Sequence, residues 1–441
     1  MVEQPLMVLL LLLGVAVTVS LLFQRLHIPA SLGYLLVGVV LGPHTAGTVI
    51  DESQINPMAE FGIGFLLFTI GLSFSLSQIY ALRHLVLGLG TVQVLLTTAV
   101  VGLAAFWIGL PAAAAFVVGA VFAQSSTTII SKQLTEQGEI HTRPERMAIA
   151  RNVFQDVTAV PFLVVIPVLG IASVESVADS LLLALAKAVL AFTSVFLAGR
   201  WLLRPMFHFV AERRSAELFT LTVLFVSLLA AWATKSLGLS MAFGAFLVGM
   251  MLGETEFRHQ VEATIRPFQD VLLGLFFVSI GMLFDPSLIP EIWWPALASG
   301  AALLVIKVIL VAIILRLAKF DKRTAVRVGL VLAVGGEFGF ALLAIALEAG
   351  VIAPHISQIV LVAILFSMIG APFLIRYNKF LTSGLAAPLT FPPSDPRETE
   401  DHGRNPLTDH VIICGFGRIG QSVVLFGSPD DLEKAENQFL S

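Results

Sequence analysis

The sequence has little charge and only one cysteine. Charged residues make up 13% of its 441 residues, whereas about 25% is typical of soluble domains. Hydrophobic residues make up 57%, so the chain cannot cover a water-facing surface and most of it must face lipid. The single cysteine, Cys414, excludes an intrachain disulfide framework. The net charge of −4 gives no indication of nucleic-acid binding.

The N-terminal apolar run also lacks two features of a signal peptide. No basic segment precedes it, and no small-residue cleavage site follows it. We therefore expect it to be retained as a first membrane span.

Apolar runs of membrane-spanning length fill the first 380 residues. Thirteen are expected, at residues 5–24, 30–46, 57–76, 85–108, 111–132, 146–171, 179–203, 216–234, 238–253, 267–284, 292–316, 325–348 and 355–376. The second and ninth runs are short, and the fifth and twelfth are interrupted by small and polar residues.

Lysine and arginine concentrate in alternate connecting loops, and Lys235 is the one exception. Because basic loops stay in the cytoplasm, this alternation predicts an N-terminus outside and a C-terminus inside. It requires an odd number of spans, in agreement with thirteen. The sequence is therefore predicted to be a multi-pass protein of the cell inner (plasma) membrane.

Two stretches of the sequence repeat each other. Residues 33–42 (GYLLVGVVLG) match residues 244–253 (GAFLVGMMLG) at an offset of 244 − 33 = 211. Gly71 and Gly281, each preceded by isoleucine, match at an offset of 210. The shift is seven spans, an odd number, so the two copies face opposite ways across the bilayer. Inverted repeats are typical of secondary transporters.

The same offset pairs the two interrupted spans. Ser125, Ser126 and Thr127 interrupt the fifth, and Gly335 and Gly336 interrupt the twelfth. Broken helices at matching places in two repeats indicate a transporter's binding site. Unwound backbone at membrane depth must be buried or line a cavity. We expect the oxygens of Ser125, Ser126 and Thr127 to serve as ion ligands.

Several polar side chains lie deep in the predicted spans. Asp156 is eleven residues beyond Glu145, about 16 Å into a roughly 30 Å core. Gln155 precedes it, Lys307 lies in the middle of the eleventh span, and Glu337 lies in the break of the twelfth. Charged groups at the bilayer centre cost about 2.5–3.5 kcal/mol each. We therefore expect these side chains to converge in one functional cavity.

A lone carboxylate in such a cavity suits an ion carrier. Asp156 can hold a proton or a hard monovalent cation, potassium or sodium, but not both well. One competitive site that opens alternately to two sides makes an antiporter. Because Gln155 is neutral, exchange is expected to be one-for-one and electroneutral unless Glu337 also takes part.

Structural roles stay open for the same residues. Asp156 and Lys307 could form a buried ion pair that only fixes helix packing, or Lys307 could be a structural counter-charge. Glu337 could instead cap the broken helix.

The C-terminal tail has a different composition. Residues 392–403 form a polar linker, and residues 410–420 (HVIICGFGRIG) are typical of a strand, a glycine turn and a helix start. Gly415, Gly417 and Gly420 form the pattern that holds phosphates at a helix N-terminus. An ordinary glycine turn is the alternative. Only 441 − 420 = 21 residues follow, so we expect a truncated domain without competent nucleotide binding.

Several motifs together resemble a known family. They are residues 33–38 (GYLLVG), 154–161 (FQDVTAVP), 239–249 (LSMAFGAFLVG), 274–277 (GLFF) and 336–338 (GEF). The sequence resembles Kef-type potassium/proton antiporters, the glutathione-regulated potassium efflux systems of the monovalent cation:proton antiporter-2 family. The resemblance covers essentially the whole chain, and the Gln-Asp pair followed by proline is its most specific part.

The resemblance implies an all-α membrane fold of about thirteen transmembrane helices. It implies inverted repeats, two crossed discontinuous helices beside the ion site, and a homodimer in membrane lipid. Asp156 is implied as the cation- and proton-binding residue with Gln155 beside it, and Lys307 matches a family position.

The resemblance also implies a domain organisation. Residues 1–380 would form the antiporter domain, 381–408 a cytoplasmic linker, and 409–441 the beginning of a Rossmann-like regulatory domain. A complete domain would bind nucleotide (AMP or NAD(H)), and a full-length form would be regulated by glutathione. The family's regulatory loop is matched by residues 256–262, after which this sequence is less acidic than the family pattern.

Three other functions were weighed. A sodium/proton antiporter of the same fold is the nearest, because Gln155 favours potassium only by resemblance. A ligand-gated potassium channel would need a filter of backbone carbonyls, and no such repeated motif occurs. An NAD-dependent oxidoreductase would need catalytic residues beside the glycine turn. We expect a transporter, not an enzyme, and no nucleic-acid partner.

Overall fold

The computed structural model describes residues 30–45, 52–73, 88–138, 143–171, 177–213 and 215–383, with a few positions between 14 and 25. Within these residues every regular element is a helix. Most of the first predicted span, the polar linker and the glycine turn at Gly415, Gly417 and Gly420 lie outside the described residues. Predictions made for those segments stay predictions.

The helices are arranged along the chain in the following order. The first repeat region contains α2 (Ala30–Leu41), α3 (Glu52–Ser73), α5 (Thr91–Trp107), α6 (Ala112–Ala123), α7 (Thr127–Glu136) and α8 (Arg143–Ile171). Next come α9 (Val177–Ala198), the π-helix η3 (Gly199–Leu203), α10 (Arg204–Glu212) and α11 (Ala216–Ser236). The second repeat region contains α12 (Met241–Gly253), α13 (Arg258–Met282), the 3₁₀ turn η4 (Pro286–Leu288), α14 (Ile289–Leu317), α15 (Lys322–Leu332), α16 (Glu337–Glu348), α17 (Pro354–Arg376) and α18 (Asn378–Leu381).

Candidate membrane spans agree with the predicted order. In the described ranges, seven helices are long and apolar enough to cross a membrane, and two bent helix pairs raise this number to nine. Three shorter apolar helices, α2, the second half of α3, and α12, complete the set. In chain order these correspond to the predicted second to thirteenth spans. The total of thirteen stays a prediction.

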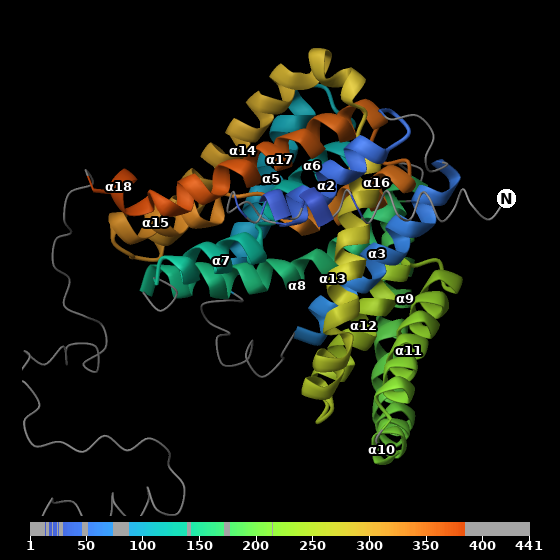
Figure 1. The fold of residues 1–441 in the computed structure, drawn as a ribbon. Helices are drawn as coiled ribbons and strands as arrows, with labels where there is room; N and C mark the ends of the chain where they lie inside the picture. Colours follow the sequence, from blue (N-terminus) through green and yellow to red (C-terminus); the bar gives the residue numbers. More distant parts are fainter. Residues whose placement is uncertain are drawn as a thin grey trace, which may run out of the picture. The chain divides into compact units, whose positions relative to one another are not determined.

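The helices form two bundles (Figure 1). We call α5–α8 with α14–α17 the crossing bundle, because it contains both broken helices, and α2, α3 and α9–α13 the scaffold bundle. Within the crossing bundle α5 packs on α6, and α14 packs on α15 and α17. Within the scaffold bundle α12 packs on α3, and α13 packs on α2 and α3.

Glycines join the two repeats inside the scaffold bundle. A Cβ atom on Gly38 of α2 would lie 2.0 Å from the Val278 carbonyl oxygen of α13. A Cβ atom on Gly249 of α12 would lie 2.1 Å from the Phe68 carbonyl oxygen of α3. Gly38 and Gly249 are repeat partners, because 249 − 38 = 211. Each repeat therefore packs its first glycine helix against the second helix of the other repeat, as an inverted pair requires.

The two interrupted spans are broken helices, as predicted. The α6–α7 break leaves the Gln124 and Ser126 backbones extended, and Ser126 caps α7 by accepting a hydrogen bond from the Ile129 amide (3.2 Å). The pair α15 and α16 bends by 50° at its break. Gly336 lies against the Ser125 backbone, where a Cβ atom would be 2.6 Å away. The two breaks therefore cross in direct backbone contact.

Candidate functional site

Three consecutive side chains at the start of α7 bind two carboxylates. Thr127 donates a hydrogen bond to Asp156 Oδ2 of α8 (2.8 Å). Ser126 and Thr128 donate to the two carboxylate oxygens of Glu337, each at 2.6 Å. Asp156, Glu337 and Thr127 are half-buried, and Thr128 is exposed. The crossing thus presents a pair of carboxylates that water can approach.

The residues that meet at the crossing are repeat partners to within one position. Ser126 and Glu337 are separated by 337 − 126 = 211 positions, and the offsets of the internal repeat are 211 and 210. Ser125 and Gly336 have the same separation. Equivalent residues meet only where a pseudo-twofold axis passes. The axis of the inverted repeat therefore runs through the crossing, where transporters of this construction bind their substrates.

Asp156 keeps one carboxylate oxygen without a donor. Its Oδ1 atom is buried and has no hydrogen-bond partner among the described residues, whereas Oδ2 accepts from Thr127. Buried carboxylate oxygens normally have partners. The Oδ1 atom therefore differs from Oδ2 and from both Glu337 oxygens, which all accept hydrogen bonds.

Asn152, one helical turn before Asp156 in α8, completes this network. Its amide is best satisfied with the nitrogen facing the Ser125 carbonyl (3.2 Å) and Gln155 Oε1 (3.3 Å). Its oxygen then accepts from the Thr127 amide (3.1 Å) and lies 2.8 Å from the Thr127 hydroxyl. The Thr127 hydroxyl is thus shared between Asp156 and Asn152.

Lys307 of α14 joins the two breaks. Its ammonium is fully buried and donates to the Gln124 carbonyl (2.7 Å), the Ser125 hydroxyl (2.8 Å) and the Val334 carbonyl (3.0 Å). Gln124 lies in the first break, and Val334 lies in the second. Across the described part of the chain, no ion pair joins Lys307 to a carboxylate, which argues against the Asp156–Lys307 pair considered above. Lys307 supplies donors to carbonyls that unwinding leaves free.

Gln155 faces away from the carboxylates, toward α5. Its amide donates to Gln93 Oε1 (2.6 Å), and Gln93 donates to the Thr97 hydroxyl (3.2 Å). All three side chains are buried. Gln155 is therefore next to Asp156 in sequence, but its contact with the site is indirect. Its Oε1 atom accepts a hydrogen bond from Asn152, which contacts Thr127.

Glu337 is the first residue of α16, and the cap position belongs to Gly336, which has no side chain. The carboxylate is bound instead by Ser126 and Thr128 of the other repeat. Its position in the first helical turn is still favourable, because the helix dipole is positive there.

Three residues that contribute to the site were not predicted from the sequence. Asn152 is one turn from Asp156 on the same helix face, a spacing that could have found it. Gln93 and Ser367 are polar side chains in apolar spans, and Ser367 accepts a hydrogen bond from the Gly335 amide (3.0 Å). Only the tertiary contacts distinguish them from polar residues that serve their own helix.

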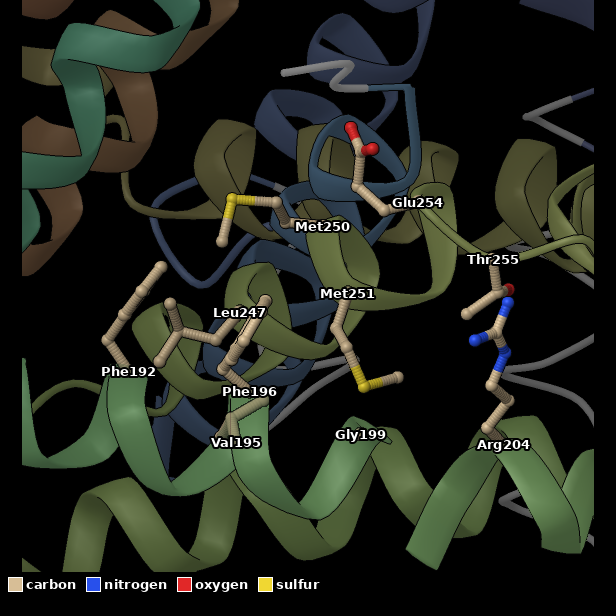
Figure 2. A pocket seen from close by; sticks show the side chains of 10 residues that line it. All are labelled: Phe192, Val195, Phe196, Gly199, Arg204, Leu247, Met250, Met251, Glu254 and Thr255. Carbon is tan, nitrogen blue, oxygen red and sulfur yellow. The ribbon is translucent and has the colours of Figure 1, made fainter. Parts of the chain in front are cut away.

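A separate cavity of about 240 Å³ lies between α9 and α12 (Figure 2). Its walls are mainly apolar, and neither Asp156 nor Glu337 lines it. At its edge Arg204 donates two hydrogen bonds to Glu256 Oε2 (2.9 and 3.2 Å), and His208 lies 2.9 Å from Glu256 Oε1. Hydrogen bonding to Arg204 lowers the pKa of Glu256 to about 2. The carboxylate that lines this cavity, Glu254, is exposed, whereas Asp156 and Glu337 at the crossing are half-buried.

Comparison with known sequences identifies the family. The sequence profile of the family "sodium/hydrogen exchanger, transmembrane" matches residues 8–377. The chain belongs to this exchanger family. The prediction of a membrane transporter, and not an enzyme, is therefore confirmed.

Several proteins similar to this chain are named for potassium efflux. The chain is 59% identical over 433 residues to a putative K(+) efflux antiporter KefB of Alkalimonas amylolytica, covering 97% of this chain and 65% of that protein. It is 39% identical to the chloroplastic K(+) efflux antiporter 2 of Arabidopsis thaliana, covering 91% of this chain and 35% of that protein. It is 33% identical to a glutathione-regulated potassium-efflux system protein of Haemophilus influenzae, covering 95% and 67%. The Kef-type resemblance is thus confirmed, and the chain spans at most about two thirds of these relatives.

A solved structure supports the exchanger fold. The sodium proton antiporter MjNhaP1 of Methanocaldococcus jannaschii matches with a TM-score of 0.64 at 17% identity. The match covers 87% of this chain and 99% of that chain. This likeness confirms the all-α antiporter fold predicted from the sequence.

Proposed function

We propose that the chain exchanges potassium for protons across the membrane by alternating access, with Asp156 as the site that both ions share. The observation that carries this proposal is the Asp156 carboxylate, which has one oxygen bound by Thr127 and one buried oxygen without a donor. Hard monovalent cations prefer oxygen ligands. The Thr127 hydroxyl, which is bonded to Oδ2, supplies one such oxygen beside the Asp156 carboxylate.

The Thr127 hydroxyl couples the proton to the local geometry. It has one hydrogen and lies 2.8 Å from both Asp156 Oδ2 and Asn152. A protonated Asp156 can donate to Thr127, which then donates to the Asn152 oxygen. An ionised Asp156 instead accepts a hydrogen bond from the Thr127 hydroxyl. The Asn152 amide must then turn its nitrogen toward Thr127, so that it donates to the hydroxyl oxygen. Proton loss and amide reorientation are thereby linked at the crossing.

Stoichiometry follows from which carboxylate has an oxygen available for the exchanged ions. Both carboxylate oxygens of Glu337 accept hydrogen bonds, whereas Asp156 has one oxygen without a donor. We therefore propose one-for-one, electroneutral exchange, with Glu337 as a fixed charge near the cation path. Gln155 and Lys307 position the crossing, through Gln93 and through the break carbonyls.

The test is cation/proton exchange in proteoliposomes, with internal pH read after potassium or sodium salts are added. We expect potassium to move protons in the wild type, and Asp156→Asn to abolish this exchange. Glu337→Gln should retain exchange at a reduced rate. Exchange that survives in Asp156→Asn but not in Glu337→Gln would move the shared site to Glu337. Potassium flux without proton movement, in both, would indicate a channel.

Sodium/proton exchange is the second candidate. The exchanger family's name and MjNhaP1 favour it, whereas the more similar relatives carry potassium names. The same vesicles decide between the two, because the half-saturating concentrations of both cations can be compared directly.

The remaining proposals concern assembly and location. We propose a homodimer in the inner membrane, with an outside N-terminus. Regulation by glutathione, and nucleotide binding at Gly415, Gly417 and Gly420, are proposed for a full-length form. Size measurement in detergent and nucleotide titration of such a form would test them.

A further inference from the structure

A chain of hydrogen-bonded side chains leads from the Asp156 carboxylate into α5. In order, its members are Asp156, Thr127, Asn152, Gln155, Gln93 and Thr97. Successive members lie between 2.6 and 3.3 Å apart. The last four side chains are each 1% exposed or less. We call these six residues the amide relay, because three side-chain amides form its centre.

The amide relay has a direction. Hydroxyls and amides can both donate and accept hydrogen bonds. In the orientation that best satisfies Asn152, each amide donates away from Asp156, and the last of them, Gln93, donates to the Thr97 hydroxyl (3.2 Å). The Asn152 oxygen then accepts the one hydrogen of the Thr127 hydroxyl. Every link is made in this direction only when Asp156 carries a proton and donates it to Thr127.

Loss of that proton reverses the amide relay. An ionised Asp156 only accepts, so Thr127 donates to it, and each amide must turn to donate toward Asp156. The Gln93 oxygen then faces Thr97, whose hydroxyl can donate to it. A mixture of directions would leave two oxygens or two N–H groups facing each other, which burial makes unfavourable. The protonation state of Asp156 and the orientation of Thr97 are therefore linked along the relay.

Reversal also changes the surroundings of the Ser125 carbonyl in the first break. In the direction just described, the Asn152 nitrogen faces this carbonyl at 3.2 Å. After reversal the Asn152 oxygen faces it instead. Two facing oxygens repel each other, and a cation between them removes that repulsion. The reversed direction therefore suits a bound cation in the same state in which Asp156 has released its proton.

The repeat partner of Thr97 has a fixed direction instead. It is Lys307 of α14, at an offset of 307 − 97 = 210. An ammonium group only donates, and Lys307 donates to the Gln124 and Val334 carbonyls. The hydroxyl at the same place in the first repeat can donate or accept. The chain of the first repeat is thus reversible where its counterpart is not.

We propose that the amide relay extends the proton site into α5, where Gln93 and Thr97 are positioning residues that set how readily Asp156 exchanges its proton for a cation. This proposal rests on the proposed exchange activity. Both residues are uncharged, so substituting them by other uncharged residues leaves the charges around the crossing in place. Those charges are Glu337, Lys307, Arg151 and the ion pair of Glu145 with Arg327.

The test measures the pH dependence of potassium/proton exchange in proteoliposomes. In Gln93→Leu, Gln155 loses the acceptor of its N–H group when Asp156 is protonated, and loses only a donor to its oxygen when Asp156 is ionised. A buried N–H group without a partner is tolerated less than a carbonyl oxygen with two lone pairs. The protonated state is therefore disfavoured more, and the pH of half-maximal exchange should fall by about half to one unit.

Thr97→Val should shift the half-maximal pH in the same direction, because Gln93 then loses its acceptor. Thr97→Ser keeps the hydroxyl and should keep the wild-type pH dependence. Adding Thr97→Val to Gln93→Leu should cause no further shift, because the relay is already cut. Thr98→Val is the matched control. Thr98 is the next residue of α5, it is buried, and its hydroxyl has no partner in the part of the chain that the structure describes.

A wild-type half-maximal pH in both Gln93→Leu and Thr97→Val, with exchange present, overturns the amide relay and leaves the exchange activity standing. Shifts that add in the double variant, or an equal shift in Thr98→Val, would show independent packing effects and also overturn it. Thr97→Val is nearly isosteric and carries the test alone if Gln93→Leu does not fold. A wild type without exchange overturns the proposed function as well.

Discussion

Adding one methyl group at Gly336 should separate the two broken helices. A Cβ atom there would lie 2.6 Å from the Ser125 carbonyl, whereas ordinary van der Waals contact begins at 3.4 Å. In Gly336→Ala the breaks must therefore move apart by 3.4 − 2.6 = 0.8 Å. The backbone of Gly336 (φ −116°, ψ 158°) suits alanine, so the effect is steric and not conformational.

The displacement is large enough to break the carboxylate contacts. The Ser126–Glu337 hydrogen bond would lengthen from 2.6 Å to as much as 2.6 + 0.8 = 3.4 Å, beyond the usual range of about 2.5–3.0 Å for two oxygens. Losing a hydrogen bond to a charged group costs about 1.5–3 kcal/mol, and overpacking costs about 1–3 kcal/mol. We expect Gly336→Ala to lose exchange and to unfold at lower temperature.

Thermal unfolding in detergent measures the loss of stability in Gly336→Ala, and cation/proton exchange in proteoliposomes measures the loss of activity. Gly370→Ala is the matched control, because a Cβ atom at Gly370 in α17 meets nothing within 4 Å. That variant should be unchanged or more stable by about 0.5–1 kcal/mol, since alanine favours helix. Wild-type exchange and stability in Gly336→Ala would refute the reasoning that backbone contact sets the crossing.

Two further predictions concern charged residues. Lys307→Met should lower the free energy of unfolding, because the buried Gln124 and Val334 carbonyls lose their donor. Each unsatisfied group costs about 1–3 kcal/mol. A more stable variant would mean that burying the ammonium costs more than its hydrogen bonds contribute. Glu256 has a folded pKa of about 2, below the ordinary carboxyl value of 4.5, so its contribution is complete above the ordinary value and is lost as pH falls toward 2. Measured by thermal unfolding in a His208→Gln background, which removes the neighbouring titratable imidazole, the stability lost on Glu256→Gln should therefore stay constant from about pH 6 to 8 and shrink below about pH 4.5. A difference that grows on acidification would contradict the Arg204–Glu256 pairing.

The sequence alone determined the order of the apolar helices and the positions of both breaks. Apolar length fixes where a helix can cross lipid, because every backbone polar group there must be satisfied within the helix. Small residues in the fifth and twelfth runs therefore predicted both breaks, and the offsets of 211 and 210 predicted which segments are equivalent. Asp156 and Glu337 followed from the cost of burying charge in a bilayer.

Only the tertiary structure decided which groups meet. A periodic pattern gives the helix face of a residue but not its partner on another helix, so it could not show that Lys307 binds the Gln124 carbonyl, 183 positions away, and the Val334 carbonyl, 27 positions away. Likewise, Thr127 and Ser126 are neighbours with similar hydroxyls, yet one binds Asp156 and the other binds Glu337. That division arises because consecutive residues at a helix start point in different directions, and the crossing angle of the two breaks determines what each direction meets.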